Sequence, residues 1–165
     1  MEHEKPLILF HASRNPHITV FEPRAETTRD KNEGPRVFAT PNRAIASLFL
    51  VATDDSWVQS GAINGVPYII ISDEERFRAM DTGGAIYSLP SDTFVYNPNK
   101  GLGELEWTST EAVCAINIEH VQSAITDMHT HGVKVYFVNP DTFNAIQTAP
   151  DDGASIIANL NSIES

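Results

Sequence analysis

The sequence contains little cysteine and little positive charge. Its one cysteine, Cys114, cannot form a disulfide within the chain, so the cysteine count gives no indication of secretion. Lys and Arg number 11 against 22 Asp and Glu, which gives a net charge of −11. Because neutralised phosphates supply most nucleic-acid affinity, this balance argues against binding to extended nucleic acid, while a local site for one phosphate group is compatible with it.

Long apolar runs are also missing. No run approaches the ~20 apolar residues that a helix needs to cross a bilayer. The N-terminal stretch has no basic region and its apolar run stops at His11, so it does not have the pattern of a signal peptide. We therefore expect no membrane partner and a cytoplasmic location. The length of 165 residues predicts a single domain over residues 1–165, with tails at 1–6 and 164–165.

The short motifs of several enzyme classes are absent as well. There is no GxxxxGK[ST] or GxGxxG, only Gly101-Leu-Gly103, and no GxSxG. Cys114 falls in an apolar strand pattern, where we expect a buried thiol. There is no cysteine pair or HExxH, and His129 and His131 are two positions apart, which points them to different sides of a helix. The sequence thus predicts neither a P-loop enzyme, nor a Ser or Cys hydrolase, nor a metal site.

Hydrophobic periodicity and turn residues predict strands and helices in mixed order. We expect strands at 7–10, 36–39, 67–72, 85–89, 93–96, 112–118 and 133–138, and helices at 43–52, 119–131, from 140 or 141, and at 154–163. Thr40 is the expected N-cap of the first helix, with Pro41 at its first position. Because the strands cluster in the middle and do not alternate regularly with helices, the predicted class is α+β.

Several polar and aromatic residues stand at the ends of these predicted elements. His11 directly follows an apolar strand and has two small neighbours, so it is either a satisfied residue at the edge of the core or a ligand-binding residue. Glu104 and Glu106 are two apart in an extended segment and so share one face. Either one of these carboxyls has a raised pKa, because the pair repels, or both are solvated. Tyr87 and Trp107 are either core aromatics or platforms for a flat ring.

Four short islands of this sequence together resemble the ADP-ribosyltransferase superfamily. Residues 9–13 (LFHAS) are similar to the YHG(S/T) strand end that binds the adenosine-side ribose of NAD. Residues 20–24 (VFEPR) resemble an LEPR signature of some small bacterial and phage members. Residues 37–41 (VFATP) resemble a VYAT strand that leads into a helix on the nicotinamide side. Residues 104–109 (ELEWTS) resemble the strand of the catalytic glutamate.

Two positions in these islands depart from the family pattern. Phe38 stands where the family often has tyrosine, and it can stack on a ring but cannot donate a hydrogen bond. Ala12 stands in place of glycine, so the backbone approach to a ligand is tighter. For the middle residue of the family's His-Tyr-Glu triad, the candidate is Tyr87.

The resemblance implies an ADP-ribosyltransferase-like split β core with flanking helices, and NAD as substrate. Glu106 would hold the ribose 2′-OH and stabilise the positive charge that develops as the bond to nicotinamide breaks. His11 would bind the far ribose and Arg24 a pyrophosphate oxygen. Glu104 would orient the nucleophile of the acceptor.

The remaining candidates for NAD binding line the same predicted site. Phe38 and Tyr87 would sandwich the nicotinamide, and Ser13 and Thr40 complete the set, although an N-cap role already accounts for Thr40.

These residues imply ADP-ribosyl transfer from NAD to an unknown protein or small-molecule acceptor, or plain NAD hydrolysis. Two other functions stay open at this point. One is a non-catalytic nucleotide-binding or phage–host interaction module of the same fold. The other is an acidic inhibitor that covers a basic partner surface, given the net charge of −11.

Overall fold

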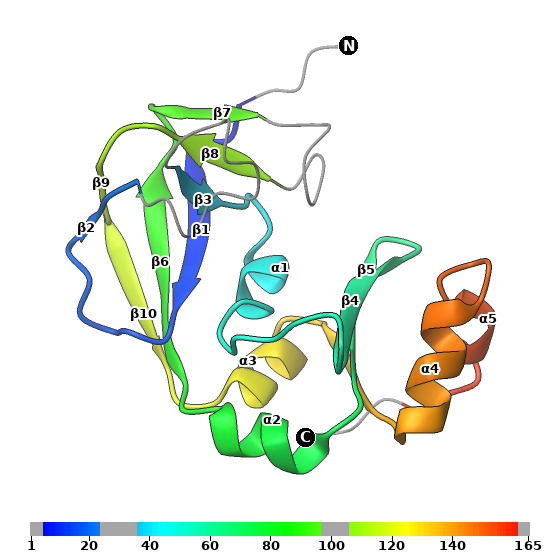
Figure 1. Cartoon of the computed structure of the whole chain (residues 1–165). Helices are drawn as coiled ribbons and strands as arrows, with labels where there is room; N and C mark the ends of the chain where they lie inside the picture. The colour runs from blue at the N-terminus through cyan, green and yellow to red at the C-terminus, as the bar shows by residue number, and fades with distance from the viewer. Residues whose placement is uncertain (1–4, 24–35, 97–105, 162–165) are drawn as a thin grey trace.

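The structure is a computed structural model, and it describes residues 5–23, 36–96 and 106–161 (Figure 1). The strands are β1 (Ile8–Ser13), β2 (Val20–Phe21), β3 (Val37–Ala39), β4 (Val58–Ile63), β5 (Val66–Ile71), β6 (Gly84–Pro90), β7 (Phe94–Tyr96), β8 (Trp107–Ser109), β9 (Val113–Cys114), β10 (Asn117–Val121) and β11 (Lys134–Phe137). The helices are α1 (Arg43–Ser47), α2 (Glu74–Met80), α3 (Ala124–Thr130), α4 (Pro140–Thr148) and α5 (Ala154–Ile157). The predicted α+β class is confirmed.

Two antiparallel sheets join into one strip of strands. The first has the order β1-β6-β10 and the second has the order β3-β8-β7. A single bridge connects them: the amide of Phe10 donates to the carbonyl of Thr40 at 2.7 Å, and the amide of Thr40 donates back at 2.9 Å. The combined order is therefore β10-β6-β1-β3-β8-β7. The short pair β2-β9 packs beside β6.

A separate mixed sheet has the order β11-β5-β4. β11 runs parallel to β5, while β4 and β5 form an antiparallel hairpin. The hairpin turn consists of Asn64 and Gly65, whose φ values of 52° and 79° are those of a type I′ turn. Figure 1 shows α4 and α5 beside this sheet, on the side away from the strip.

The core has three parts that follow from this arrangement. One cluster unites α1, α2 and α3 with the facing sides of the strip and the mixed sheet, and includes Leu50, Ile71 and Met128. A second cluster lies on the opposite face of the strip, where Leu9 and Tyr87 are fully buried. The third lies between the mixed sheet and the helices α4 and α5. Successive residues of β1 therefore face different clusters, as strand alternation requires.

The start of α1 differs from the prediction. The N-cap is Asn42, whose Oδ1 accepts from the amides of Ala44 at 2.9 Å and Ile45 at 3.2 Å. Thr40 instead belongs to the bridge with β1, and its Oγ1 accepts from the amide of Asn42 at 3.2 Å. The helix also ends early, at Ser47, because the following residues continue only as turns.

The segment 112–131 is also divided differently from the prediction. The single expected strand is two strands, β9 and β10, and the expected helix begins at Ala124 because Glu119 pairs with β6 as part of β10. Cys114 is exposed, contrary to the expected buried thiol, since β9 pairs only with the two-residue strand β2 and stands opposite the exposed Val20. The sequence pattern did not predict α2 and β4.

Candidate functional site

Three of the four sequence islands meet on neighbouring strands. Residues 9–13 lie in β1, residues 37–39 form β3, and residues 107–109 form β8. β3 pairs with β8 along its length, and the Phe10–Thr40 bridge joins β3 to β1. Segments separated by tens of residues in the sequence are therefore adjacent in the strip (Figure 1).

His11 lies where β1 and β3 separate. Its imidazole Nδ1 donates to the backbone carbonyl of Phe38 at 2.6 Å. The backbone amide and carbonyl of Phe10 point toward β3, and those of Ala12, two residues further along the strand, point the same way. In a regular antiparallel ladder the Ala12 amide would therefore donate to the Phe38 carbonyl. The side chain of His11 takes the carbonyl instead, so the ladder between β1 and β3 consists of one bridge.

The surroundings of His11 favour a neutral imidazole. Burial lowers the pKa of His11, and the hydrogen bond to the Phe38 carbonyl opposes this effect only in part. A carbonyl can only accept, so the proton resides on Nδ1 and leaves Nε2 as an acceptor. The ring also packs against Phe21, with 4.7 Å between the ring centroids. This histidine is therefore suited to accept a hydrogen bond from a hydroxyl.

Tyr87 stands directly opposite His11 on β6 and is fully buried. Its hydroxyl donates to the carbonyl of Asn15 at 2.6 Å and accepts from the amide of Ile18 at 3.0 Å. Its ring lies edge-on to Phe21 at 4.8 Å. Tyr87 thus fixes the loop after β1, and in this structure its ring has no exposed face on which a ligand could stack.

Glu106 is buried, with 5% of its surface exposed, and it immediately precedes β8. The pairing of Ala39 with Trp107 places Glu106 next to Thr40 in the ladder. Strand alternation then puts Thr40 and Glu106 on the face opposite to Trp107, together with the half-buried Phe38. Trp107 itself is a core residue.

The predicted site residues therefore divide into two groups. Phe38, Thr40 and Glu106 share one face of the strip by register, whereas His11 packs toward the other face and reaches β3 through its ring nitrogen. Ser13 ends β1, and its Oγ accepts from the amide of the loop residue Asn15 at 3.1 Å. Arg24 and Glu104 lie outside the described residues.

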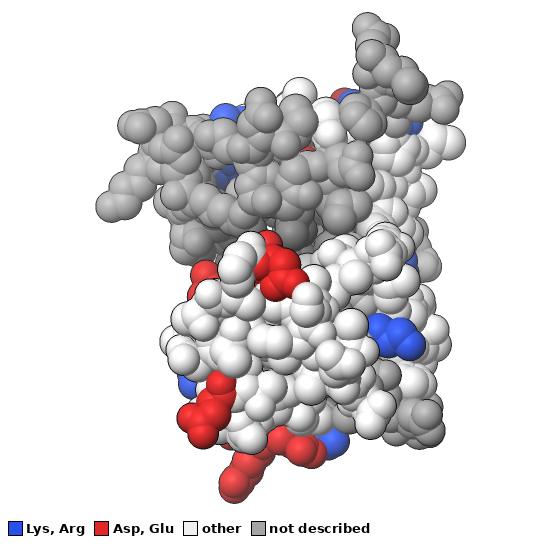
Figure 2. All heavy atoms as spheres, turned by 90° about the vertical axis from the view of Figure 1, so that its right-hand side faces the viewer, with Lys and Arg blue, Asp and Glu red and all other residues white. Residues whose placement is uncertain are grey.

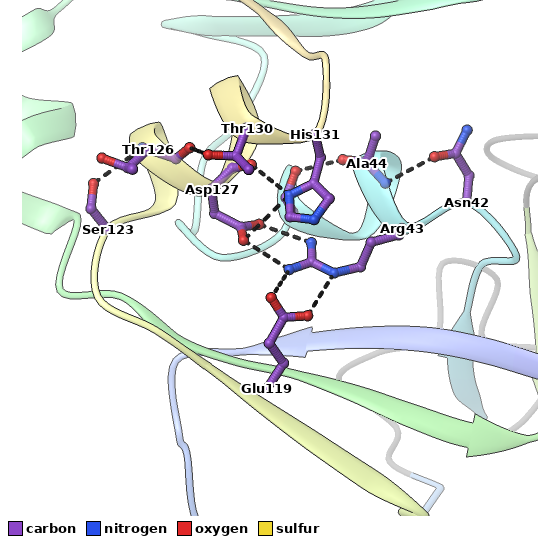
Figure 3. Close-up of polar contacts among 10 residues, drawn as sticks. Asn42, Arg43, Ala44, Glu119, Ser123, Thr126, Asp127, Thr130 and His131 are labelled. Atoms are coloured by element: carbon purple, nitrogen blue, oxygen red, sulfur yellow. Dashed lines mark hydrogen bonds and ion pairs between the residues drawn. The ribbon is translucent and has the colours of Figure 1, made fainter. Parts of the chain in front are cut away.

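Sequence reasoning missed a second polar cluster, which is centred on Arg43 (Figure 3). The guanidinium binds both carboxylate oxygens of Asp127, at 2.8 and 2.9 Å, and contacts those of Glu119 at 3.0 and 3.3 Å. Burial works against the charge of Arg43, but the hydrogen bonds to these two carboxylates outweigh it and raise the pKa of the guanidinium. Helix α1 is thereby attached to both α3 and β10.

His131 completes this cluster at the C-terminal end of α3. Its Nδ1 lies 2.8 Å from the carbonyl oxygen of Asp127 and 3.5 Å from one of the Asp127 carboxylate oxygens. Ligand-type atoms of Glu119, Asp127 and His131 lie within 4.8 Å of one another. Because the Arg43 guanidinium already compensates both carboxylates, we interpret the cluster as a structural ion network that joins α1 to α3 and β10.

No protein-family model, curated protein or solved structure matches this chain. Over the described residues, no helix is both long and apolar enough to span a membrane.

Proposed function

We propose that this protein binds NAD where β1, β3 and β8 meet, and that it transfers ADP-ribose to an acceptor or hydrolyses NAD. The observation that supports the proposal is the adjacency of three sequence islands that resemble ADP-ribosyltransferase motifs, on strands that the Phe10–Thr40 bridge and the β3–β8 ladder hold side by side. In this proposal the strip, which parts at His11, corresponds to the split β core of that fold.

A neutral His11 can accept a hydrogen bond from a ribose hydroxyl. With its proton on Nδ1 and engaged by Phe38, its Nε2 accepts a hydrogen bond from a ribose hydroxyl. The lowered pKa keeps the imidazole neutral at physiological pH, so this acceptor is preserved.

Glu106 supplies the negative charge that the reaction needs. When the bond from ribose to nicotinamide breaks, positive charge develops on the ribose, and a fixed carboxylate stabilises it. Glu106 is buried, so water screens its charge less than it would at the surface. In this proposal one carboxylate oxygen accepts from the ribose 2′-OH and thereby holds the sugar next to the charge.

The remaining predicted site residues have different roles in the proposed site. Phe38 and Thr40 lie on the same face as Glu106, so the Phe38 ring can stack on nicotinamide there. Ser13 stands at the end of β1, and Arg24 would pair with the pyrophosphate. Tyr87 acts indirectly by holding the loop after β1.

The test compares Glu106→Gln with Glu111→Gln, which removes a carboxylate of the same type from an exposed position five residues away. Both variants and the wild type are incubated with labelled NAD and cell lysate, and free nicotinamide and labelled macromolecules are quantified. We expect Glu106→Gln to lower nicotinamide release about 10²-fold or more, as loss of a transition-state contact does, and Glu111→Gln to leave it unchanged. Equal turnover by all three proteins would remove the enzymatic proposal.

Glu104→Ala separates transfer from cleavage in the same assay. If Glu104 orients the acceptor, this variant should lose labelling of macromolecules while it retains most nicotinamide release. Parallel loss of both activities would assign Glu104 to NAD cleavage itself.

A second candidate, a nucleotide-binding module without turnover, is favoured by one observation. The hydroxyl of Tyr87 is occupied by the backbone of Asn15 and Ile18, so this candidate for the middle of the triad does not offer its hydroxyl to a ligand. Calorimetric titration with NAD distinguishes the two functions, because a module of this kind gives a binding isotherm and no free nicotinamide.

A further inference from the structure

The β4–β5 hairpin has an open edge along β4. β4 lies at the end of its sheet, and among the described strands it pairs only with β5. The amide of Ser72 donates to the carbonyl of Trp57 at 3.0 Å, and the two-residue turn closes on the pair Ile63 and Val66. Both facts show which residues of β4 form backbone hydrogen bonds with β5: they are the odd-numbered ones.

The even-numbered residues Ser60 and Ala62 therefore direct their amides and carbonyls away from β5. No backbone hydrogen bond to either residue from outside the hairpin occurs within the described part of the chain, and both are exposed. Two residues before Ser60, the amide of Val58 donates to the carbonyl of Asp54 at 3.1 Å, which closes that end of the edge to a further donor. The open stretch is short and accessible, and it has donors and acceptors in the spacing of a strand.

This edge lacks the charged residues with which proteins commonly protect exposed strands. Residues 56–72 contain no Asp, Glu, Lys or Arg, although one residue in five of the chain is charged. Two other edge strands do contain charge: β10 contains Glu119, and β11 begins with Lys134. Figure 2 views the molecule from the side of α4 and α5, and there most of the described surface is uncharged, with the charged residues in a few separate clusters.

We propose that β4 pairs with β4 of a second copy of this chain, antiparallel and centred on Ser60. In this register Ser60 faces Ser60 of the second copy, and Ala62 lies opposite Val58 of the second copy. All three side chains are small or of moderate size, and none is charged, so the pair contains neither a steric nor an electrostatic conflict. The amide of that Val58 is bonded to Asp54, so at this pair the Ala62 amide donates to the Val58 carbonyl and no bond forms in the other direction. The two mixed sheets then form one continuous sheet.

The net charge of −11 favours this surface over others for self-association. Two copies with this charge repel each other, and the repulsion is least where the contact surface has no charge. The β4 strand itself offers no acidic side chain to a partner of opposite charge, and the exposed Asp54 borders it only at the Val58 end. The association is therefore driven by backbone pairing and apolar contact, and added salt should strengthen it by screening the repulsion.

The oligomeric state of the full chain tests the proposal. Mass is measured by light scattering after size exclusion, from low to high micromolar concentration, for the wild type, Ser60→Lys and Ala145→Lys. The control, Ala145→Lys, adds the same charge at an exposed position of α4. Ser60→Lys puts two lysines opposite each other, and we expect dimerisation about tenfold weaker or more, whereas the control should dimerise as the wild type does.

Each result decides for or against the second copy. A concentration-dependent dimer that is lost in Ser60→Lys, kept in Ala145→Lys and strengthened by salt supports it. A wild type that stays monomeric throughout overturns it, and leaves the edge to a strand from another protein. A dimer that Ser60→Lys does not weaken also overturns it, because another surface must then hold the copies together. Circular dichroism spectra of the variants confirm that each is folded.

Discussion

The ion network around Arg43 makes a quantitative prediction for Asp127→Ala. The side chain of Asp127 is 7% exposed and that of Arg43 is 15% exposed, and two short hydrogen bonds join them. Removing one partner of a buried ion pair typically costs 3–5 kcal/mol, because the remaining charge stays buried without compensation. Since Glu119 still contacts the guanidinium, we expect the free energy of unfolding to fall by about 3 kcal/mol, the lower end of that range.

Glu119→Ala is the matched comparison, because it removes the second carboxylate from the same guanidinium. The side chain of Glu119 is 51% exposed, so water screens its interaction with Arg43. We expect a loss of about 0–1 kcal/mol, as for ion pairs at the surface. Urea unfolding followed by circular dichroism gives both values, provided that the dependence on urea concentration has the same slope in all variants.

Equal losses for the two alanine variants would refute this reasoning, because they would show that burial does not decide the strength of the two contacts. A third variant is an independent check. Arg43→Met combined with Asp127→Leu removes both buried charges, and it should be more stable than Asp127→Ala alone because no uncompensated charge remains. A double variant that is less stable than Asp127→Ala would show that the ion pair has a role beyond its charges.

Three further predictions concern the region around β1. Burial lowers the pKa of His11 in the folded chain, so the contribution of this histidine to stability is full above its ordinary pKa of about 6.5 and is lost as the pH falls below that value. His11→Gln should therefore flatten the decrease in unfolding free energy between about pH 7 and pH 5. An unchanged pH profile would contradict this. Tyr87→Phe should cost about 1–3 kcal/mol in urea unfolding, because it leaves backbone groups of Asn15 and Ile18 without their partner; no loss would show that the loop rearranges. Gly84→Ala should lower the free energy of unfolding by about 3 kcal/mol or more. Gly84 has a φ of 152°, and a Cβ there would lie 2.2 Å from a backbone carbonyl oxygen of β1. A variant as stable as the wild type would mean that the strand can shift.

The elements that the sequence predicted well are those with a strong local signal. The apolar segments of β5, β6 and β11 are strands, and α4 begins at Pro140, where proline at the first helical position favours a helix. Gly132, just after α3, has the left-handed conformation that glycine commonly adopts at a helix C-terminus. In these segments, periodicity and end residues act together, so local information is sufficient.

The errors occurred where a tertiary contact overrides a local preference. Thr40 has the residue type of an N-cap, but its backbone is taken by the bridge to Phe10, and the cap moves to Asn42. Glu119 looked like the start of a helix, yet pairing with β6 keeps it extended. β4 was missed because its uncharged sequence has little alternation, and its strand character comes from pairing with β5.

The candidate site was predictable only in part. The order of the islands indicated that His11, Phe38 and Glu106 belong together, and the strands on or beside which they lie are indeed neighbours. Which face each side chain takes depends on register, which no local pattern specifies. The Arg43 cluster could not have been found from the sequence, because Arg43 is more than 70 residues away from Glu119 and Asp127 and the three residues come from three elements.

The imidazole of His11 also determines where the sheet stops. It supplies the donor that the Ala12 amide would supply in an uninterrupted ladder. A side chain without a donor at position 11 would leave the Phe38 carbonyl available to that amide, so β1 and β3 could extend their contact by one more pair. Loss of this histidine would then make the strip more regular while it closed the gap between the two strands.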